Sequence, residues 1–234
     1  PPRSTPYPTL FPYTTLFRTL LGHLPPVSGH VEINGREYSS LSRRQVARHI
    51  AYVPQLHEPP FAFSVFDVAL TGCVSRLGLL GSPSRADREQ TEEVLERLGI
   101  AHLAARPFTE LSGGEQQMTL IARALVQDGR ILVMDEPAAA LDLRNQATVL
   151  RCVRDLADER RGVVMTSHNP DHAFLVATRA VLITGDRRIL SGPVDEVLTE
   201  ENLQAAYGTR VQVLETTSPD GEAVRTCIPT LELT

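Results

Sequence analysis

Lysine is absent from the sequence, so arginine supplies all 23 of its basic side chains. The formal net charge is -5, which leaves no excess of positive charge for binding nucleic acid. Cysteine is scarce: Cys73, Cys152 and Cys227 are scattered along the chain without the spacing of a zinc site. We interpret them as buried thiols of a protein in a reducing compartment.

Long apolar runs are missing as well. No stretch reaches the roughly 18 consecutive apolar residues of a membrane-spanning helix. The first residues do not show the charged region, apolar run and small-residue cleavage site of a signal peptide. We therefore expect a cytoplasmic protein that reaches a membrane only through a partner.

The first 13 residues, PPRSTPYPTLFPY, differ in composition from the rest of the chain. They are rich in proline, which cannot donate the backbone N–H that a strand ladder requires. The hexamer PYPTLF is followed directly by a near copy, PYTTLF. We expect residues 1–13 to form a disordered or foreign tail and residues 14–234 to form an α/β domain.

From residue 14 onward, the apolar positions predict alternating helices and strands. Leucine and phenylalanine recur at helical spacing up to Leu24, and a Pro-Pro pair follows. Ser84 and Asp87 predict a capped helix that ends at Gly99. Predicted strands lie at 50–53, 131–136 and 162–168, and predicted hairpins at 30–38, 180–192 and about 209–233. Predicted helices lie at 14–24, 42–49 (short), 64–80, 84–100, 113–125, 143–158 and 170–176. This alternation predicts a largely parallel sheet covered by helices on both faces.

Two motifs carry chemical meaning by themselves. ILVMDEP, residues 131–137, is an apolar strand that ends in two acids, which we expect at the carboxyl edge of the sheet, facing a cation or a polarised water. LSGGEQQ, residues 111–117, places a hydroxyl and two glycines at a helix start, where exposed N–H groups favour an anion. Taken alone, each motif has an ordinary alternative: a chance Asp-Glu pair after a strand, or a helix cap in a flexible loop.

In combination the motifs are specific. YVPQ (52–55), LSGGEQQ, ILVMDEP, ALD (140–142) and TSHNPDHA (166–173) form one ordered series, and the chain resembles the ATP-binding subunit of an ABC transporter from about Thr14 to its end. The resemblance implies a P-loop NTPase-like ABC nucleotide-binding fold with a helical subdomain at about residues 60–106. It also implies ATP and Mg²⁺ as ligands.

The resemblance implies roles for individual residues. Asp135 matches the magnesium carboxylate of the Walker B motif, and Glu136 matches the base that polarises the attacking water. His168 matches the switch histidine that contacts the γ-phosphate. Gln55 matches the glutamine that touches Mg²⁺ and reports to the membrane subunit. Phosphoryl transfer requires such parts: a cation on the phosphate oxygens, an oriented water and donors for developing charge.

Other matched residues serve a neighbouring subunit. Ser112, Gly113 and Gly114 match the signature that closes over the γ-phosphate bound on the opposing subunit, and Asp142 matches the loop at the dimer interface. The resemblance therefore implies a homo- or heterodimer of ATP-binding subunits docked on integral-membrane permease subunits. It places the chain at the inner face of the cell membrane, with a substrate-binding protein as an indirect partner and no nucleic acid.

The cargo is suggested by two segments. FSVFDVALTGCVSRLGLLGSPSRADRE and SHNPDHAFL resemble the metal-chelate importers, which take up iron-siderophore, haem or cobalamin complexes. An ordinary solvated helix explains SRADREQ equally well.

The phosphate-binding loop departs from the family. Thr14 and Thr15 match the Ser/Thr pair that closes the Walker A motif, with Thr14 as the Mg²⁺-binding hydroxyl, but residues 7–14 read YPTLFPYT where G-x-x-x-x-G-K-[ST] is expected. Tyr7 and Pro12 occupy the glycine positions and Tyr13 the lysine position. Proline has no N–H to offer a phosphate, and tyrosine brings no positive charge. We expect this loop to be defective.

Several interpretations stay open. The chain is either a degenerate subunit or one whose first 13 or so residues come from a foreign or chimeric reading frame; the repeat and the intact motifs favour the second. We expect the defective loop to impair ATP hydrolysis by this chain. Two other functions compete with transport: a non-catalytic or regulatory ABC-fold subunit, and a soluble ABC ATPase outside transport.

Overall fold

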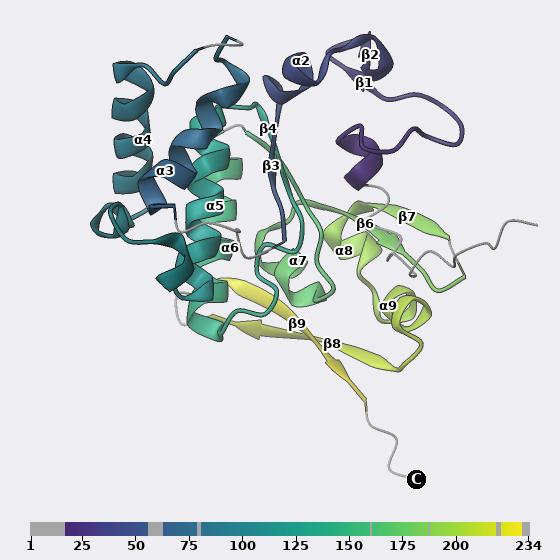
Figure 1. Cartoon of the computed structure of the whole chain (residues 1–234). Coiled ribbons are helices and arrows are strands. Elements are labelled where there is room, and N and C mark those ends of the chain that lie inside the picture. Colours follow the sequence, from purple (N-terminus) through teal and green to yellow (C-terminus); the bar gives the residue numbers. More distant parts are fainter. Residues whose placement is uncertain are drawn as a thin grey trace, which may run out of the picture. The chain divides into compact units, whose positions relative to one another are not determined.

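The computed structural model describes residues 17–55, 63–78, 81–159, 161–186, 188–218 and 221–230 (Figure 1). The chain divides into two compact units. The first holds the described residues up to Val149 together with Leu156–Thr166, and the second holds Leu150–Asp155 and the described residues from Ser167 onward. Each unit is described by itself below.

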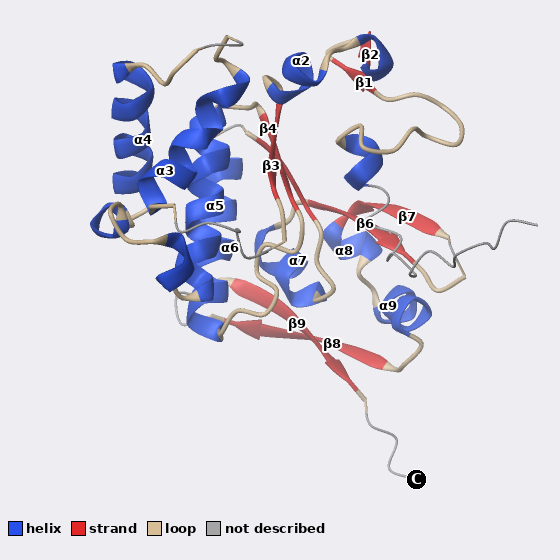
Figure 2. Ribbon diagram, in the orientation of Figure 1, coloured by secondary structure: helices blue, strands red, loops and turns tan. Residues whose placement is uncertain are grey.

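The first unit contains a parallel sheet in the order β3-β4-β5 (Figure 2). The strands are β3 (Ile50–Val53), β4 (Ile131–Met134) and β5 (Gly162–Met165), in the segments where the sequence predicts them. β4 lies in the middle and its last three residues are buried, which matches the continuous apolar run of a strand covered on both faces. The predicted α/β class with a parallel sheet is confirmed.

A group of helices follows β3 in the chain. It comprises α3 (Val65–Leu70), η2 (Thr71–Ser75), α4 (Arg85–Arg97), η3 (Ala101–Leu103), η4 (Phe108–Glu110) and the long α5 (Gly113–Gln127). α3 and α4 both pack against α5 (Figure 1). The single helix predicted over residues 64–80 is wrong, because the α-helix ends at Leu70 and tightens into η2. There Gly72 approaches α5 so closely that a Cβ would lie 2.1 Å from the carbonyl oxygen of Arg123.

The N-terminal helix is shorter than predicted. Residues 17–20 are helical, and Gly22 then adopts a left-handed backbone with φ of +69°. Leu24, expected on the apolar face of that helix, is therefore exposed. A Cβ on Gly22 would lie 2.3 Å from the ring of Tyr38, so this turn requires glycine.

The hairpin predicted around Asn34 and Gly35 is confirmed. β1 (Glu32–Ile33) and β2 (Arg36–Glu37) pair antiparallel, and both turn residues have positive φ, as a two-residue hairpin requires. The chain continues through η1 (Tyr38–Ser40) and α2 (Arg43–Ala47) into β3.

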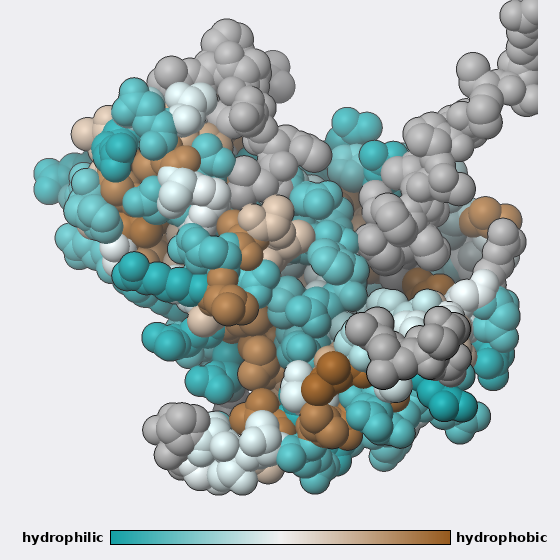
Figure 3. Space-filling view, turned by 90° about the horizontal axis from the view of Figure 1, so that it is seen from below, coloured by the Kyte–Doolittle hydropathy of each residue, from teal (hydrophilic) through white to brown (hydrophobic). Residues whose placement is uncertain are grey.

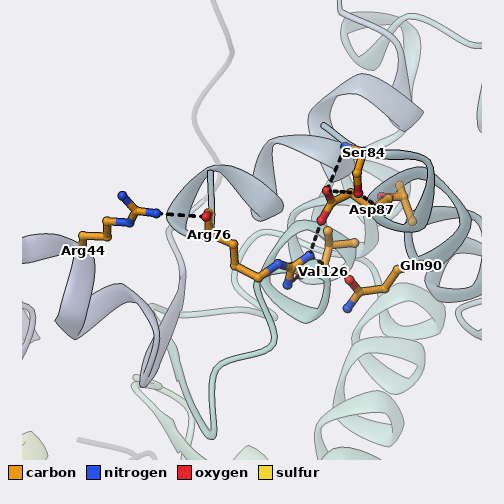
Figure 4. A network of polar contacts seen from close by, with 7 residues as sticks. Arg44, Arg76, Ser84, Asp87, Gln90 and Val126 are labelled. Carbon is orange, nitrogen blue, oxygen red and sulfur yellow. Dashed lines mark hydrogen bonds and ion pairs between the residues drawn. The ribbon is translucent and has the colours of Figure 1, made fainter. Parts of the chain in front are cut away.

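Arg76 ties the helices together through a polar network (Figure 4). Its guanidinium donates to Asp87 and Gln90 on α4 at 2.9 and 2.8 Å and to the carbonyl of Val126 on α5 at 2.7 Å. Asp87 also closes the predicted capping box with Ser84 at the start of α4. The hydrogen bond from the Ser84 hydroxyl, followed by that from Arg76, lowers the pKa of Asp87 to about 2.

A second arginine joins α2 to the same region. Arg44 donates to the carbonyl oxygen of Arg76 at 2.9 Å (Figure 4). It also donates to the carbonyl oxygen of Ser75 at 3.2 Å. These carbonyls end the 3₁₀ helix and lack partners within it, so the arginine supplies the donors that the helix end requires.

The second unit is built from short helices and two antiparallel hairpins. α7 (Pro170–Val176) precedes the hairpin of β6 (Arg179–Ile183) and β7 (Ile189–Pro193), and β8 (Val211–Thr217) pairs with β9 (Ala223–Pro229). Their core includes Val194, Val197, Leu198, Leu203 and Val211. α6 (Leu143–Asp158) contributes residues to both units.

Two helices of this unit were not predicted. α8 (Val194–Val197) is a single turn, too short to show a periodic pattern. α9 (Glu200–Tyr207) carries signals that the sequence does contain, because Thr199 caps its start and Gly208, with φ of +70°, ends it.

The described surface is mixed in polarity. On the face shown in Figure 3, hydrophilic residues predominate and apolar residues lie in narrow strips between them. None of the helices within the described residues is both long and apolar enough to span a bilayer. Cys73 and Cys152 are buried thiols as predicted, whereas Cys227 is only partly buried.

Candidate functional site

Two acids follow the central strand of the sheet. Asp135 and Glu136 come directly after Met134, the last residue of β4, as the sequence predicts. The amide of Asp135 still donates to the carbonyl of Val53 on β3 at 2.9 Å, so the sheet fixes the backbone at this position. Asp135 is only 9% exposed, so the protein shields most of this residue from solvent.

Thr166 joins the two acids. It follows β5, and its amide donates to the carbonyl of Met134 at 3.0 Å. Its buried hydroxyl donates to Oδ1 of Asp135 at 2.8 Å and accepts the backbone N–H of Glu136 at 2.9 Å. Sequence reasoning missed this residue, although the first residue after a neighbouring parallel strand must lie at the same edge of the sheet.

The backbone after Asp135 is strained. Glu136 and Ala140 adopt positive φ of 47° and 58° without being glycine. Such conformations cost about 1–3 kcal/mol each and persist where surrounding contacts impose them. The hydrogen bond from the Glu136 amide to Thr166 is one such contact.

Tyr52 faces the same site from β3. It pairs with Val133 in the sheet, so its side chain lies on the face that carries Asp135 two residues further on. Burial raises the pKa of Tyr52, and the charge of Asp135 and a hydrogen bond to its carboxylate raise it further. Arg123 donates to the carbonyl of Tyr52 at 3.3 Å, and burial lowers the pKa of this arginine.

The LSGGEQQ segment starts α5. Ser112 is its N-cap and closes a capping box with Glu115, in which the Ser112 amide donates to the Glu115 carboxylate at 2.8 Å. The hydrogen bond from the Ser112 hydroxyl lowers the pKa of Glu115. Gly113 is exposed and Gly114 is buried. Ser112 therefore caps the helix, and the helix presents its positive N-terminal end at Gly113.

Asp142 directly precedes α6 and is exposed. Its carboxylate accepts the amide of Asn145 at 2.8 Å. The same segment packs against the glycines of α5, since a Cβ on Gly113 would lie 3.4 Å from Leu141 and one on Gly114 would meet Asn145. The first unit thus brings residues 112–114 and 141–145 together.

His168 belongs to the second unit, in the loop before α7. Asn169 caps that helix, and its side chain accepts the amide of Asp171 at 3.0 Å. The hydroxyl of Tyr207 on α9 donates to the carbonyl of His168 at 2.9 Å, a contact that sequence reasoning missed. His172 is buried beside the hydroxyl of Ser167, in keeping with a structural role.

The remaining predicted residues are at or beyond the borders of the described chain. Gln55 is exposed just after β3. Thr14, Thr15 and the whole segment 7–14 lie outside the described residues. Within the described residues, no group of three or more His, Cys, Asp or Glu side chains forms a metal cluster.

Known proteins with similar sequence or structure identify the family. The ABC transporter family model matches residues 13–139. A protein of Haemophilus influenzae, described as an uncharacterized ABC transporter ATP-binding protein, is 38% identical over 201 residues, 86% of this chain and 76% of its own length. The molybdate import ATP-binding protein MolC of the same species is 36% identical over 195 residues, 83% of this chain and 72% of its own length.

A solved structure agrees with these relatives. It is an inward-facing transporter described as of the metal-chelate type, with a TM-score of 0.84 at 31% identity, covering 94% of this chain and 83% of its own. The fold is that of an ATP-binding α/β domain, and the chain belongs to the ABC transporter family. Within that family it is of the ATP-binding type, the ATPase that is coupled to transport.

Proposed function

We propose that this chain is an ATP-binding subunit of an ABC importer for a metal chelate, with a defective phosphate loop of its own and an intact signature for a partner. The paired acids at the end of β4, held by Thr166, are the observation that supports the ATPase role. The defect rests on residues 7–14, which contain neither glycine nor lysine.

Mg²⁺ fits the residues present. It prefers oxygen ligands and is commonly held by one or two carboxylates with substrate phosphates and waters, so a cluster of three protein ligands is not required. Asp135 is the ligand we assign, with Gln55 and the Thr14 hydroxyl as further oxygen donors. When bound, the ion neutralises charge on the phosphate oxygens.

Other residues act on the water and the phosphate. We assign Glu136 as the base that orients the attacking water and accepts its proton. The hydrogen bond to Thr166 holds the strained backbone of Glu136, and this backbone fixes the position from which the Glu136 side chain extends. General-base catalysis requires such positioning of the base. His168 is the assigned γ-phosphate contact, and Tyr207 holds its backbone.

ATP itself does not fit residues 7–14. A phosphate loop turns consecutive backbone N–H groups toward the phosphates and adds one lysine, whereas Pro8 and Pro12 have no N–H and Tyr13 has no charge. The family model begins to match only at residue 13, after both glycine positions of the loop. We therefore propose that the chain's own half-site hydrolyses no ATP.

The signature half-site is intact. Ser112, Gly113 and Gly114 stand at the start of α5, where the capped helix presents its positive end. A second ATP-binding subunit with a normal phosphate loop would hold ATP against this surface. A homodimer of this chain would have two defective sites, and a heterodimer would keep one.

The transport partners follow from the family. ATP-binding subunits of importers act with integral-membrane permease subunits, so we place this chain on the inner face of the membrane, bound to the permease. A substrate-binding protein is then an indirect partner that acts through the permease. The molybdate relative and the metal-chelate structure support a metal-containing cargo. We propose an iron-siderophore or similar chelate.

Measuring ATP binding and hydrolysis tests the proposal. The natural chain should hydrolyse no ATP, and a loop-restored chain, with residues 7–14 replaced by G-x-x-x-x-G-K-T, should gain Mg²⁺-dependent hydrolysis. Hydrolysis by the natural chain at the rate of the restored one refutes the defect. An inactive restored chain refutes the claim that Asp135, Glu136 and His168 are otherwise competent.

Reading the gene upstream of the Thr14 codon separates the two origins of the tail. An in-frame glycine-lysine loop identifies residues 1–13 as foreign. Confirmation of PYPTLFPY in the gene identifies a degenerate subunit.

A further inference from the structure

One side chain of the first unit touches both segments that we assign to the partner's nucleotide. Asn145, in the first turn of α6, lies between Gly114 of the signature and Asp142 of the loop before α6. Neither the sequence motifs nor the family comparison assigns it a role.

Its contact with Gly114 is unusually close. A Cβ added to Gly114 would lie 2.4 Å from both Cγ and Oδ1 of Asn145 and 2.9 Å from its Cβ. Real Cβ atoms do not approach neighbours this closely, so the Asn145 side chain occupies the space that a Cβ on residue 114 would need. Gly113 next to it has a looser neighbour, Leu141 at 3.4 Å.

Its contact with Asp142 fixes the amide. Nδ2 of Asn145 donates to Oδ2 of Asp142 at 3.0 Å, and the Asn145 backbone N–H donates to Oδ1 at 2.8 Å. An ionised carboxylate only accepts hydrogen bonds, so the amide nitrogen must face Asp142. The amide oxygen of Asn145 is therefore the atom that faces Gly114, and the two contacts restrict rotation of the amide group.

We propose that Asn145 is a positioning residue that sets the distance between the signature and the Asp142 loop. This inference rests on the proposed function, because both segments matter only if they meet a nucleotide on the partner subunit. A displacement of about 1 Å in a catalytic arrangement can cost roughly 100-fold in rate. Asn145 prevents such a displacement by contacting both segments at once.

A mixed dimer isolates this half-site. The partner is the loop-restored chain carrying Ser112→Arg, which has a phosphate loop but no working signature. It cannot hydrolyse ATP alone, and neither can the natural chain. Hydrolysis in the mixture therefore reports only the restored loop against the natural chain's signature.

Variants of the natural chain then test Asn145. We expect Asn145→Ala to lower kcat of the mixture at least 10-fold with little change in the KM for ATP, because the phosphate loop lies on the other subunit. Asn145→Asp keeps the shape of the side chain but loses the amide donor and repels Asp142. We expect this variant to lower kcat of the mixture to a similar extent. Arg151→Ala, at an exposed position of the same helix, is the control and should retain the kcat of the natural mixture.

Unfolding measurements test the contact without any activity. Gly114→Ala should lower the unfolding midpoint of the full chain, and it should lower it less when combined with Asn145→Gly, which removes the three atoms nearest to the new methyl. Additive effects would overturn the proposed contact. An active mixture with unchanged kcat for Asn145→Ala would overturn the positioning role, whereas an inactive natural mixture would refute the proposed function itself.

Discussion

The hydroxyl of Thr166 offers a sharp test of the acidic site. Valine has nearly the same shape as threonine but no hydroxyl, so Thr166→Val removes the donor to Asp135 and the acceptor for the Glu136 amide without opening a cavity. Thr166 is 8% exposed, which leaves little room for water to replace the lost partner.

The cost of this substitution can be worked out from the two contacts. A hydrogen bond to a charged group contributes about 1.5–3 kcal/mol and a neutral one about 1 kcal/mol. Thr166→Val should therefore lower the free energy of unfolding by about 3 kcal/mol. For a chain of this length, that corresponds to a fall in Tm of about 6–12 °C.

Urea and thermal unfolding of the full chain provide the assay. Thr166→Ser keeps the hydroxyl and loses one methyl group, so it should cost only about 1 kcal/mol. The expected order of stability is natural chain, Thr166→Ser, Thr166→Val. The reasoning is refuted if Thr166→Val unfolds within about 0.5 kcal/mol of the natural chain or is more stable than Thr166→Ser.

Two further predictions concern the helices that follow β3. The pKa of Asp87 is about 2 in the folded chain and 3.8 ordinarily, so its stabilising effect is complete above pH 4 and is lost as the pH falls toward 2. Asp87→Asn should flatten this part of the stability profile, measured by urea unfolding between pH 5 and 2, and an unchanged slope would contradict the network with Arg76. Gly72→Ala should destabilise the chain by about 3 kcal/mol, because the new methyl would overlap the carbonyl of Arg123. Gly78→Ala, with open space around it, is the control in the same measurement, and equal effects of the two would contradict the packing.

Much of the fold could be predicted from local patterns. The strand at 131–134, the helices at 143–158 and 170–176, and the cap formed by Ser84 follow from apolar periodicity and capping residues that lie within a few positions of each other. The N-terminal helix was predicted too long, because the apolar spacing up to Leu24 was followed past Gly22, whose left-handed backbone ends the helix. The ring of Tyr38, which leaves no room for a Cβ at Gly22, comes from another segment, and local patterns cannot show such a neighbour.

The sequence by itself determined the class of protein, the order of the motifs and the identity of the two acids after β4, since these are properties of short stretches. Only the tertiary structure decided that Thr166 holds both acids, that Asn145 lies on Gly114 and that Tyr207 binds the carbonyl of His168. The partners in these contacts are between 30 and 39 positions apart, with Thr166 and Asp135 31 apart. Their meeting depends on strand register and helix packing, which hydrophobic patterning along one segment does not encode.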